Sequence, residues 1–116
     1  MIRHRKSLVK PPPPSCPLDE CMRLVGGTWT PNIIWYLREN PRRFMELKGD
    51  LKGISAKTLT ARLRRMEKDG VVSRQERPTS PPTVWYSLTD LGRRLLPAIE
   101  AIAAVGLELK GLSSSE

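Results

Sequence analysis

Apolar residues recur at helical spacing in the middle of the chain. Leu59, Leu63 and Met66 stand at positions i, i+4 and i+7, which places them along one side of a helix. Ser55 is suited to cap the start of this helix, and Asp69-Gly70 is suited to end it. Because Lys and Arg occupy many of the positions between, the pattern predicts a short amphipathic basic helix.

Three shorter apolar stripes precede this helix and predict three more helices. The first ends at Gly26-Gly27, and the second begins with Thr30 as its cap and Pro31 in its first turn. Asn40-Pro41 is expected to stop the second helix, and Gly49 weakens the third. The stripes consist of Leu18, Met22 and Val25; of Ile33, Ile34 and Leu37; and of Phe44, Leu47 and Leu51.

After residue 70 the period of the apolar pattern changes from helical to alternating. Residues 71–77 predict one strand, and Val84, Tyr86 and Leu88 alternate along a second. Residues 78–82 contain three prolines and should form a rigid tip between the strands. A last helix is predicted from Thr89-Asp90 onward, and Pro97 should kink or restart it. Its apolar positions are Leu91, Leu95, Ile99, Ile102 and Leu109.

This order of elements predicts a winged helix-turn-helix, a mainly helical α+β fold. A short helix followed by a capped basic helix forms the helix-turn-helix, and the hairpin after it supplies the wing. Residues 1–15 are basic and contain four consecutive prolines, which predicts a disordered arm. The folded domain is expected to span residues 16–112.

The chain carries a formal net charge of +8, which attracts it to polyanions such as nucleic acid or an anionic membrane surface. No apolar run approaches the ~18 residues of a membrane span. The basic N-terminus is followed by prolines and not by the apolar region of a signal peptide. We therefore expect a cytoplasmic protein with no membrane association. The charge alone could be a solubilising surface, but together with the predicted helix-turn-helix and wing it favours double-stranded DNA as the partner.

The basic helix supplies most of the candidate DNA-binding residues. At ~100° per residue, Lys57, Ala61, Arg64 and Lys68 lie opposite the apolar stripe. The candidates for contacts with base edges lie in its N-terminal half: Lys57, Thr58, Ala61 and Arg62. The candidates for phosphate contacts are Arg64, Arg65 and Lys68, with Ser55 as a further phosphate ligand at the helix start.

The predicted wing adds Arg77 as a candidate for the minor groove, since an Arg beside a rigid tip can enter it. The alternative is a surface hairpin in which Arg74 and Arg77 pair with Glu76. Trp29, Trp35 and Tyr36 are more typical of core or dimer contacts than of a ligand cage.

The sequence contains few of the residues and motifs that an enzyme active site requires. His4 is the only histidine, so His-based triads and most zinc sites are excluded, and no phosphate-binding Gly-rich loop is present. We expect no catalytic residues, no metal and no cofactor. Cys16 and Cys21 lack the C-x-x-C spacing of thiol oxidoreductases.

Several motifs, taken in order, resemble the HxlR-type winged-helix transcriptional regulators, relatives of the MarR group. They are Cys16-Pro17-Leu18, Gly27 to Thr30, Arg43 to Leu47, Ile54 to Arg64, Glu67 to Val72, Val84 to Thr89 and Gly92 to Pro97. The family usually has Lys at the position of Thr28, often Trp at that of Val105, and a charged residue at that of Trp85. The resemblance implies a homodimer joined through the first and last helices, with the two basic helices reading a pseudo-palindromic operator.

Cys16 directly precedes Pro17 at the start of the first predicted helix, where backbone amides stabilise a thiolate. Some members of the family resemble thiol-based sensors with a cysteine at this position, which makes Cys16 a candidate redox sensor for an electrophile. The alternative is a plain buried thiol. A small-molecule effector could instead occupy a pocket between the dimer helices and the DNA-binding lobe, lined by Trp35 or Tyr36.

These observations predict a homodimeric, sequence-specific repressor or activator of transcription that responds to a thiol reagent or a ligand. The alternative is a winged-helix module that binds protein, or coats DNA without sequence preference.

Overall fold

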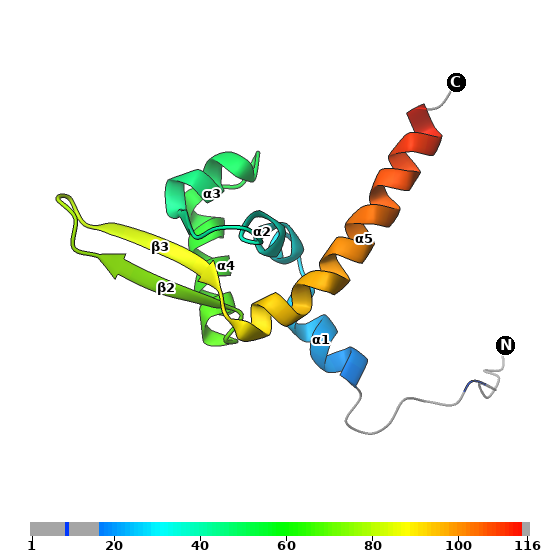
Figure 1. Cartoon of the computed structure of the whole chain (residues 1–116), viewed down its shortest axis with the longest axis horizontal. Helices are drawn as coiled ribbons and strands as arrows, with labels where there is room; N and C mark the ends of the chain where they lie inside the picture. The colour runs from blue at the N-terminus through cyan, green and yellow to red at the C-terminus, as the bar shows by residue number, and fades with distance from the viewer. Residues whose placement is uncertain (1–8, 10–16, 115–116) are drawn as a thin grey trace, which may run out of the picture.

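The computed structural model describes residue 9 and residues 17–114 (Figure 1). Apart from Val9, the predicted arm at residues 1–15 lies outside the described residues, and so does Cys16. The elements follow the order helix, helix, strand, helix, helix, strand, strand, helix. They are α1 (Pro17–Val25), α2 (Thr30–Tyr36), β1 (Arg42–Arg43), α3 (Phe44–Asp50), α4 (Ala56–Lys68), β2 (Val72–Arg77), β3 (Thr83–Leu88) and α5 (Asp90–Ser114).

The apolar stripe of α4 anchors this helix in the core, as the sequence predicts. Leu59, Leu63 and Met66 are all buried and pack with the apolar residues of α2, α3, β2 and the first half of α5. The prediction for α2 is confirmed in the same way by the complete burial of Ile33 and Ile34. The helix-turn-helix formed by α3 and α4 is therefore held by a single hydrophobic core.

Both predicted ends of α4 are confirmed. The Ser55 hydroxyl accepts a hydrogen bond from the backbone N–H of Thr58 at 3.0 Å and donates to Thr58 Oγ1 at 2.9 Å. At the other end Asp69 is the C-cap residue, and Gly70 follows with a φ of +79°. A side chain is strained at such a φ, so glycine is suited to turn the chain into the wing.

The wing is an antiparallel hairpin of β2 and β3, paired from Val72↔Leu88 to Arg77↔Thr83. The sequence analysis missed a third strand, β1, which pairs Arg42 with Tyr86 and places β3 in the centre of the sheet. A strand of two residues has no period for a sequence pattern to detect. Figure 1 shows the hairpin projecting from the body of the molecule.

The start and end of α2 differ from the prediction. Thr30 is not the cap: it is already helical and only 2% exposed, and Trp29 stands at the N-cap position with a φ of 80° and no side-chain capping bond. The helix also ends at Tyr36, before the Asn40-Pro41 stop signal. Tertiary packing of Thr30 has overridden its local capping preference.

The last helix, α5, runs without interruption through Pro97, so the predicted restart does not occur. Pro97 is exposed, and its missing N–H removes one backbone hydrogen bond from the helix there. Thr89 caps the start by accepting a hydrogen bond from Gly92 N at 3.1 Å. The C-terminal half extends away from the wing and α4 (Figure 1). Within the described residues, none of the helices has the length and apolar content that crossing a membrane requires.

Candidate nucleic-acid interface

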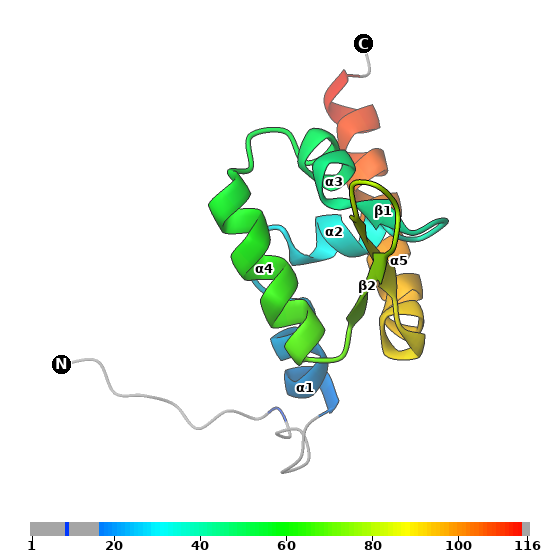
Figure 2. The same cartoon turned by 90° about the vertical axis from the view of Figure 1, so that its left-hand side faces the viewer.

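The outward face of α4 carries a strip that we call the cationic strip: Lys57, Ala61, Arg64 and Lys68, all exposed. Within residues 17–114, none of the three charged members of the strip forms an ion pair or a side-chain hydrogen bond. Figure 2 shows α4 at full length, with the hairpin beside it. The strip thus combines unpaired cations with one small residue that permits close approach.

One edge of the cationic strip faces the wing. Arg64 lines a cavity of about 380 Å³ between α4 and the sheet, together with Arg74 and Tyr86. Thr60 and Glu67 complete its lining from the helix side. The basic surface of α4 therefore continues across this cavity onto the base of the hairpin.

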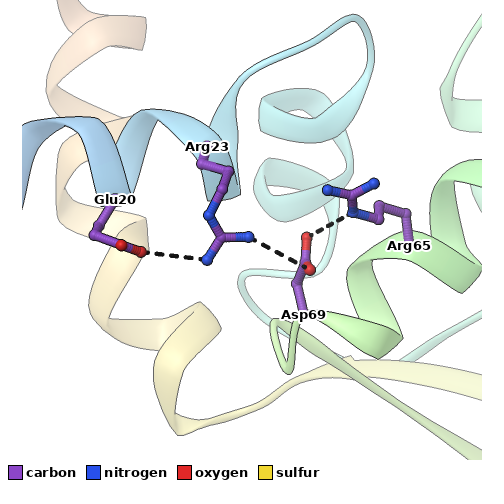
Figure 3. A network of polar contacts seen from close by, with 4 residues as sticks. All are labelled: Glu20, Arg23, Arg65 and Asp69. Atoms are coloured by element: carbon purple, nitrogen blue, oxygen red, sulfur yellow. Dashed lines mark hydrogen bonds and ion pairs between the residues drawn. The ribbon is translucent and has the colours of Figure 1, made fainter.

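The other edge of α4 is tied to α1 by a chain of ion pairs (Figure 3). Arg65 Nε lies 3.2 Å from Asp69 Oδ2, and Arg23 of α1 lies 3.8 Å from Asp69 Oδ1. Arg23 also pairs with Glu20, at 3.3 Å. Arg65 is therefore held against Asp69, whereas the other two predicted phosphate ligands, Arg64 and Lys68, have no such partner among the described residues.

The structure separates Arg62 from the other predicted base-reading residues. Lys57, Thr58 and Ala61 are exposed, but Arg62 is half-buried and faces α1 and α2. Its guanidinium lies beside Gly27, where a β-carbon would stand 3.4 Å from Nη1. Since Arg62 is three residues after Leu59, it stands on the flank of the buried stripe, a position that helical spacing could have revealed.

Ser55 is exposed at the start of α4, and its hydroxyl is already engaged with Thr58 as donor and acceptor. A phosphate contact by this hydroxyl would have to replace the bond that it donates to Thr58 Oγ1, because a phosphate oxygen accepts hydrogen bonds. The structure thus supports the capping role of Ser55 more directly than its predicted role as a phosphate ligand.

On the wing, Arg77 is oriented by Trp85. The Arg77 guanidinium lies 4.4 Å from the centroid of the Trp85 ring, and the Arg43 guanidinium lies 5.5 Å from it. Trp85 Nε1 donates a hydrogen bond to Thr83 Oγ1 at 3.1 Å, which fixes the ring. In the described part of the chain, Glu76 pairs with neither Arg74 nor Arg77, in contrast to the alternative considered above. The sequence analysis did not identify this role of Trp85.

The start of α3, the first helix of the helix-turn-helix, is fixed by a carboxylate. Glu46 Oε1 accepts a hydrogen bond of 2.9 Å from the backbone N–H of Arg43. This bond, with the nearby charges of Arg43 and Arg42, lowers the pKa of the Glu46 carboxyl below its usual range.

Two helices outside the helix-turn-helix expose apolar side chains. On α1, Leu18 is 64% and Met22 55% exposed. On α5 the large apolar residues that are exposed are Ile102, Val105, Leu107 and Leu109. Each of the two helices therefore carries apolar surface that this chain by itself leaves in contact with solvent.

A cavity of about 300 Å³ lies between α2 and α5 and is lined by Trp35, Ile99 and Ile102 among others. This is the region where the sequence analysis placed an effector pocket; Trp35 lines the cavity, whereas Tyr36 does not. Among the residues that the structure describes, no three His, Cys, Asp or Glu side chains gather as they would around a metal ion.

Comparison with known proteins agrees with this geometry. The sequence pattern described as HxlR-like helix-turn-helix matches residues 24–112. The chain is 43% identical over 93 residues to the uncharacterized HTH-type transcriptional regulator BH0655 of Halalkalibacterium halodurans, covering 79% of this chain and 82% of that protein.

Two solved structures are also similar. The putative MarR-family transcriptional regulator from Porphyromonas gingivalis W83 superposes with a TM-score of 0.80 at 37% identity, covering 86% of this chain and 98% of the other. The redox regulator HypR in its reduced form gives a TM-score of 0.78 at 30% identity, covering 86% and 99%.

Proposed function

Since the chain belongs to the HxlR-like helix-turn-helix family of transcriptional regulators, which are not enzymes, we propose how it binds DNA. We propose that it acts as a homodimer on a pseudo-palindromic operator. In this proposal each α4 enters the major groove at one half-site. The two half-sites are centred about one duplex turn, ~34 Å, apart.

The cationic strip of α4 is the observation that carries this proposal. Lys57 and Ala61, with the neighbouring Thr58, lie in the N-terminal half of α4 and are proposed to face base edges. Arg64 and Lys68 are proposed to bind phosphates, which increases affinity without reading sequence. Because the charged members of the strip form no ion pairs within the described chain, DNA need not displace an internal partner.

The homodimer is supported by the exposed apolar surface of α1 and α5. Ile102, Val105 and Leu109 of α5 stand at positions i, i+3 and i+7 and form one apolar stripe, of which Ile102 is 67% exposed. A second copy of the chain would cover such a stripe and fix the distance between the two α4 helices. Dimerisation and operator spacing are thus linked through α5.

Selection of bound duplexes from a random pool tests the proposal against its alternative, a module that coats DNA or binds protein. A sequence-specific regulator should enrich a two-fold symmetric site and prefer it to random duplex by ~10³-fold or more. Equal affinity for selected and random duplexes would favour the coating module, and failure to bind duplex would contradict DNA binding altogether.

A thiol response is a finer part of the proposal. It is supported by the place of Cys16 directly before α1 and by the likeness to HypR, which is described as a redox regulator. Diamide should change operator affinity in the native protein and in Cys21→Ser, which removes the exposed thiol of α1. An unchanged affinity in the native protein, equal to that of Cys16→Ser, would exclude a sensing role for Cys16.

A further inference from the structure

A small cavity lies between α1, α2 and the flank of α4 that faces away from the wing. Its volume is about 170 Å³, and three arginines line it: Arg23 from α1, and Arg62 and Arg65 from α4. Thr30, at the start of α2, is among the other lining residues. The cavity thus gathers three guanidinium groups from two helices that are separate in the sequence.

The positive charge of this cavity exceeds the negative charge that faces it. Asp69 is the only acidic residue among its lining residues, and Arg23 and Arg65 share it at 3.8 and 3.2 Å. Glu20 contacts Arg23 from outside the cavity lining (Figure 3). Three guanidinium groups against one carboxylate leave the lining with an excess of two positive charges.

Among the described residues, Arg62 is the member of this group without an ion-pair partner. Its Nε is inaccessible to solvent and forms no hydrogen bond within the described chain. Two other buried side-chain atoms also form no hydrogen bond within the described chain: Arg42 Nε and Asp50 Oδ2. These two atoms lie 2.7 Å apart, however, and form an ion pair with each other. Arg62 forms no ion pair of this kind with any residue that the structure describes. Since a guanidinium cannot release its proton in a protein, Arg62 adds to the lining a positive charge that no acidic side chain of the described residues neutralises.

We propose that this cavity binds a phosphate-type oxyanion, with Arg62 as its principal ligand and Arg23 and Arg65 as supporting ligands. The planar guanidinium donates two parallel hydrogen bonds to such an anion, which a lysine cannot reproduce. The oxyanion is either a phosphate of the DNA backbone or a free phosphate group. Only the identification of the anion as a phosphate of the DNA backbone rests on the proposed function. A free phosphate group could bind in the cavity without DNA.

Thermal unfolding of the full chain in sodium phosphate and in sodium chloride, at equal ionic strength and pH 7, tests the site directly. We expect the Tm to rise with phosphate concentration and not with chloride. In Arg62→Met the phosphate-specific rise should be lost, whereas the Tm in chloride should be equal or higher, since a half-buried cation without an ion pair among the described residues has been removed. Arg64→Ala, a matched loss of charge from the cationic strip, should keep the rise.

Calorimetric titration with inorganic phosphate provides a second readout that does not depend on Arg62→Met folding. Arg23→Gln should bind phosphate about tenfold more weakly than the native chain, as expected for the loss of one charge-assisted contact. An equal Tm in phosphate and chloride for the native chain would overturn the proposal. So would a phosphate response that is as large in Arg62→Met as in the native chain, because phosphate also stabilises folded proteins without a binding site, or an unchanged affinity in Arg23→Gln.

A competition experiment then distinguishes the two sources. Phosphate added to the complex with duplex DNA, at constant ionic strength, should displace the duplex if a backbone phosphate occupies the cavity. It should bind without displacement if the occupant is a free phosphate group. Both results support the site, whereas a chain that binds phosphate but no duplex would contradict the proposed function and leave the cavity proposal standing.

Discussion

The outward face of α4 and the outward face of the second half of α5 are both exposed, but they differ in chemistry: the first is cationic and the second is apolar. α4 presents unpaired cations around Ala61, and α5 presents Ile102, Val105 and Leu109. A charged surface of this kind favours a polyanion, and an apolar stripe favours another apolar surface. In the proposed homodimer, DNA contact and self-association would therefore use different surfaces. Loss of a cation from α4 should leave the dimer intact, whereas loss of the dimer should also weaken operator binding.

The largest expected effect is the loss of stability that follows when a buried side chain of α4 is shortened. Leu63→Ala should destabilise the fold by ~2–5 kcal/mol, because it leaves a cavity beneath the helix. Met45→Ala, at an apolar residue of α3 that is 69% exposed, should change stability by less than about 0.5 kcal/mol. Denaturant unfolding measures both, and equal losses would contradict the account of how α4 is held.

The next largest effect is expected when a charged residue is introduced into the apolar stripe of α5. Val105→Asp should convert dimer to monomer and reduce operator affinity on the order of 100-fold, because the two half-sites are no longer bound together. Ala104→Asp adds the same charge at an exposed residue on a different side of α5 and should leave the dimer intact. Sedimentation and operator titration measure the two effects, and a dimeric Val105→Asp would remove α5 from the interface.

Removing a cation from the strip should have a smaller effect that is uniform across sequences. Arg64→Ala and Lys68→Ala should each weaken binding to all duplexes and reduce the slope of log affinity against log salt by about 0.9. Arg93→Ala removes the same charge from an exposed residue of α5 and should leave the slope unchanged. A slope that changes equally in Arg93→Ala would mean that only the net charge matters.

The smallest expected effect is a pH dependence at the start of α3. Because the folded pKa of Glu46 is lowered, its contribution to stability is complete above the unfolded value of about 4.3 and is lost as the pH falls through the folded pKa. Glu46→Gln should therefore lower the Tm slightly at pH 7, and the difference should disappear in acid. A Tm difference that persists unchanged at pH 2 would assign the effect to packing instead.

Features carried by local chemistry could be predicted from the sequence. The Ser55 cap, the buried stripe of α4 and the strand that contains Val84, Tyr86 and Leu88 each follow from neighbouring residues alone. The strip opposite the stripe follows from the same helical geometry, and for this reason Lys57 and Lys68 are exposed where the pattern places them.

The remaining features depend on contacts between distant segments. Arg62 was expected to face bases because it is basic and lies within α4, but α1 and α2 cover its flank. Thr30 has the chemistry of a cap, yet packing buries it inside the first turn. Trp85 orients Arg43 and Arg77 from the centre of the sheet, and this depends on a register that includes the undetected strand β1.

The central claim, that the outward face of α4 lies in the DNA groove, is tested most directly by crosslinking from the middle of that face. A photoreactive group attached at Ala61→Cys, in a chain that also carries Cys16→Ser and Cys21→Ser, should crosslink to bases within each half-site of the selected operator. The same group at Arg93→Cys on α5 should give no crosslink. Absence of a crosslink from residue 61, or equal crosslinking from residue 93, would contradict the claim.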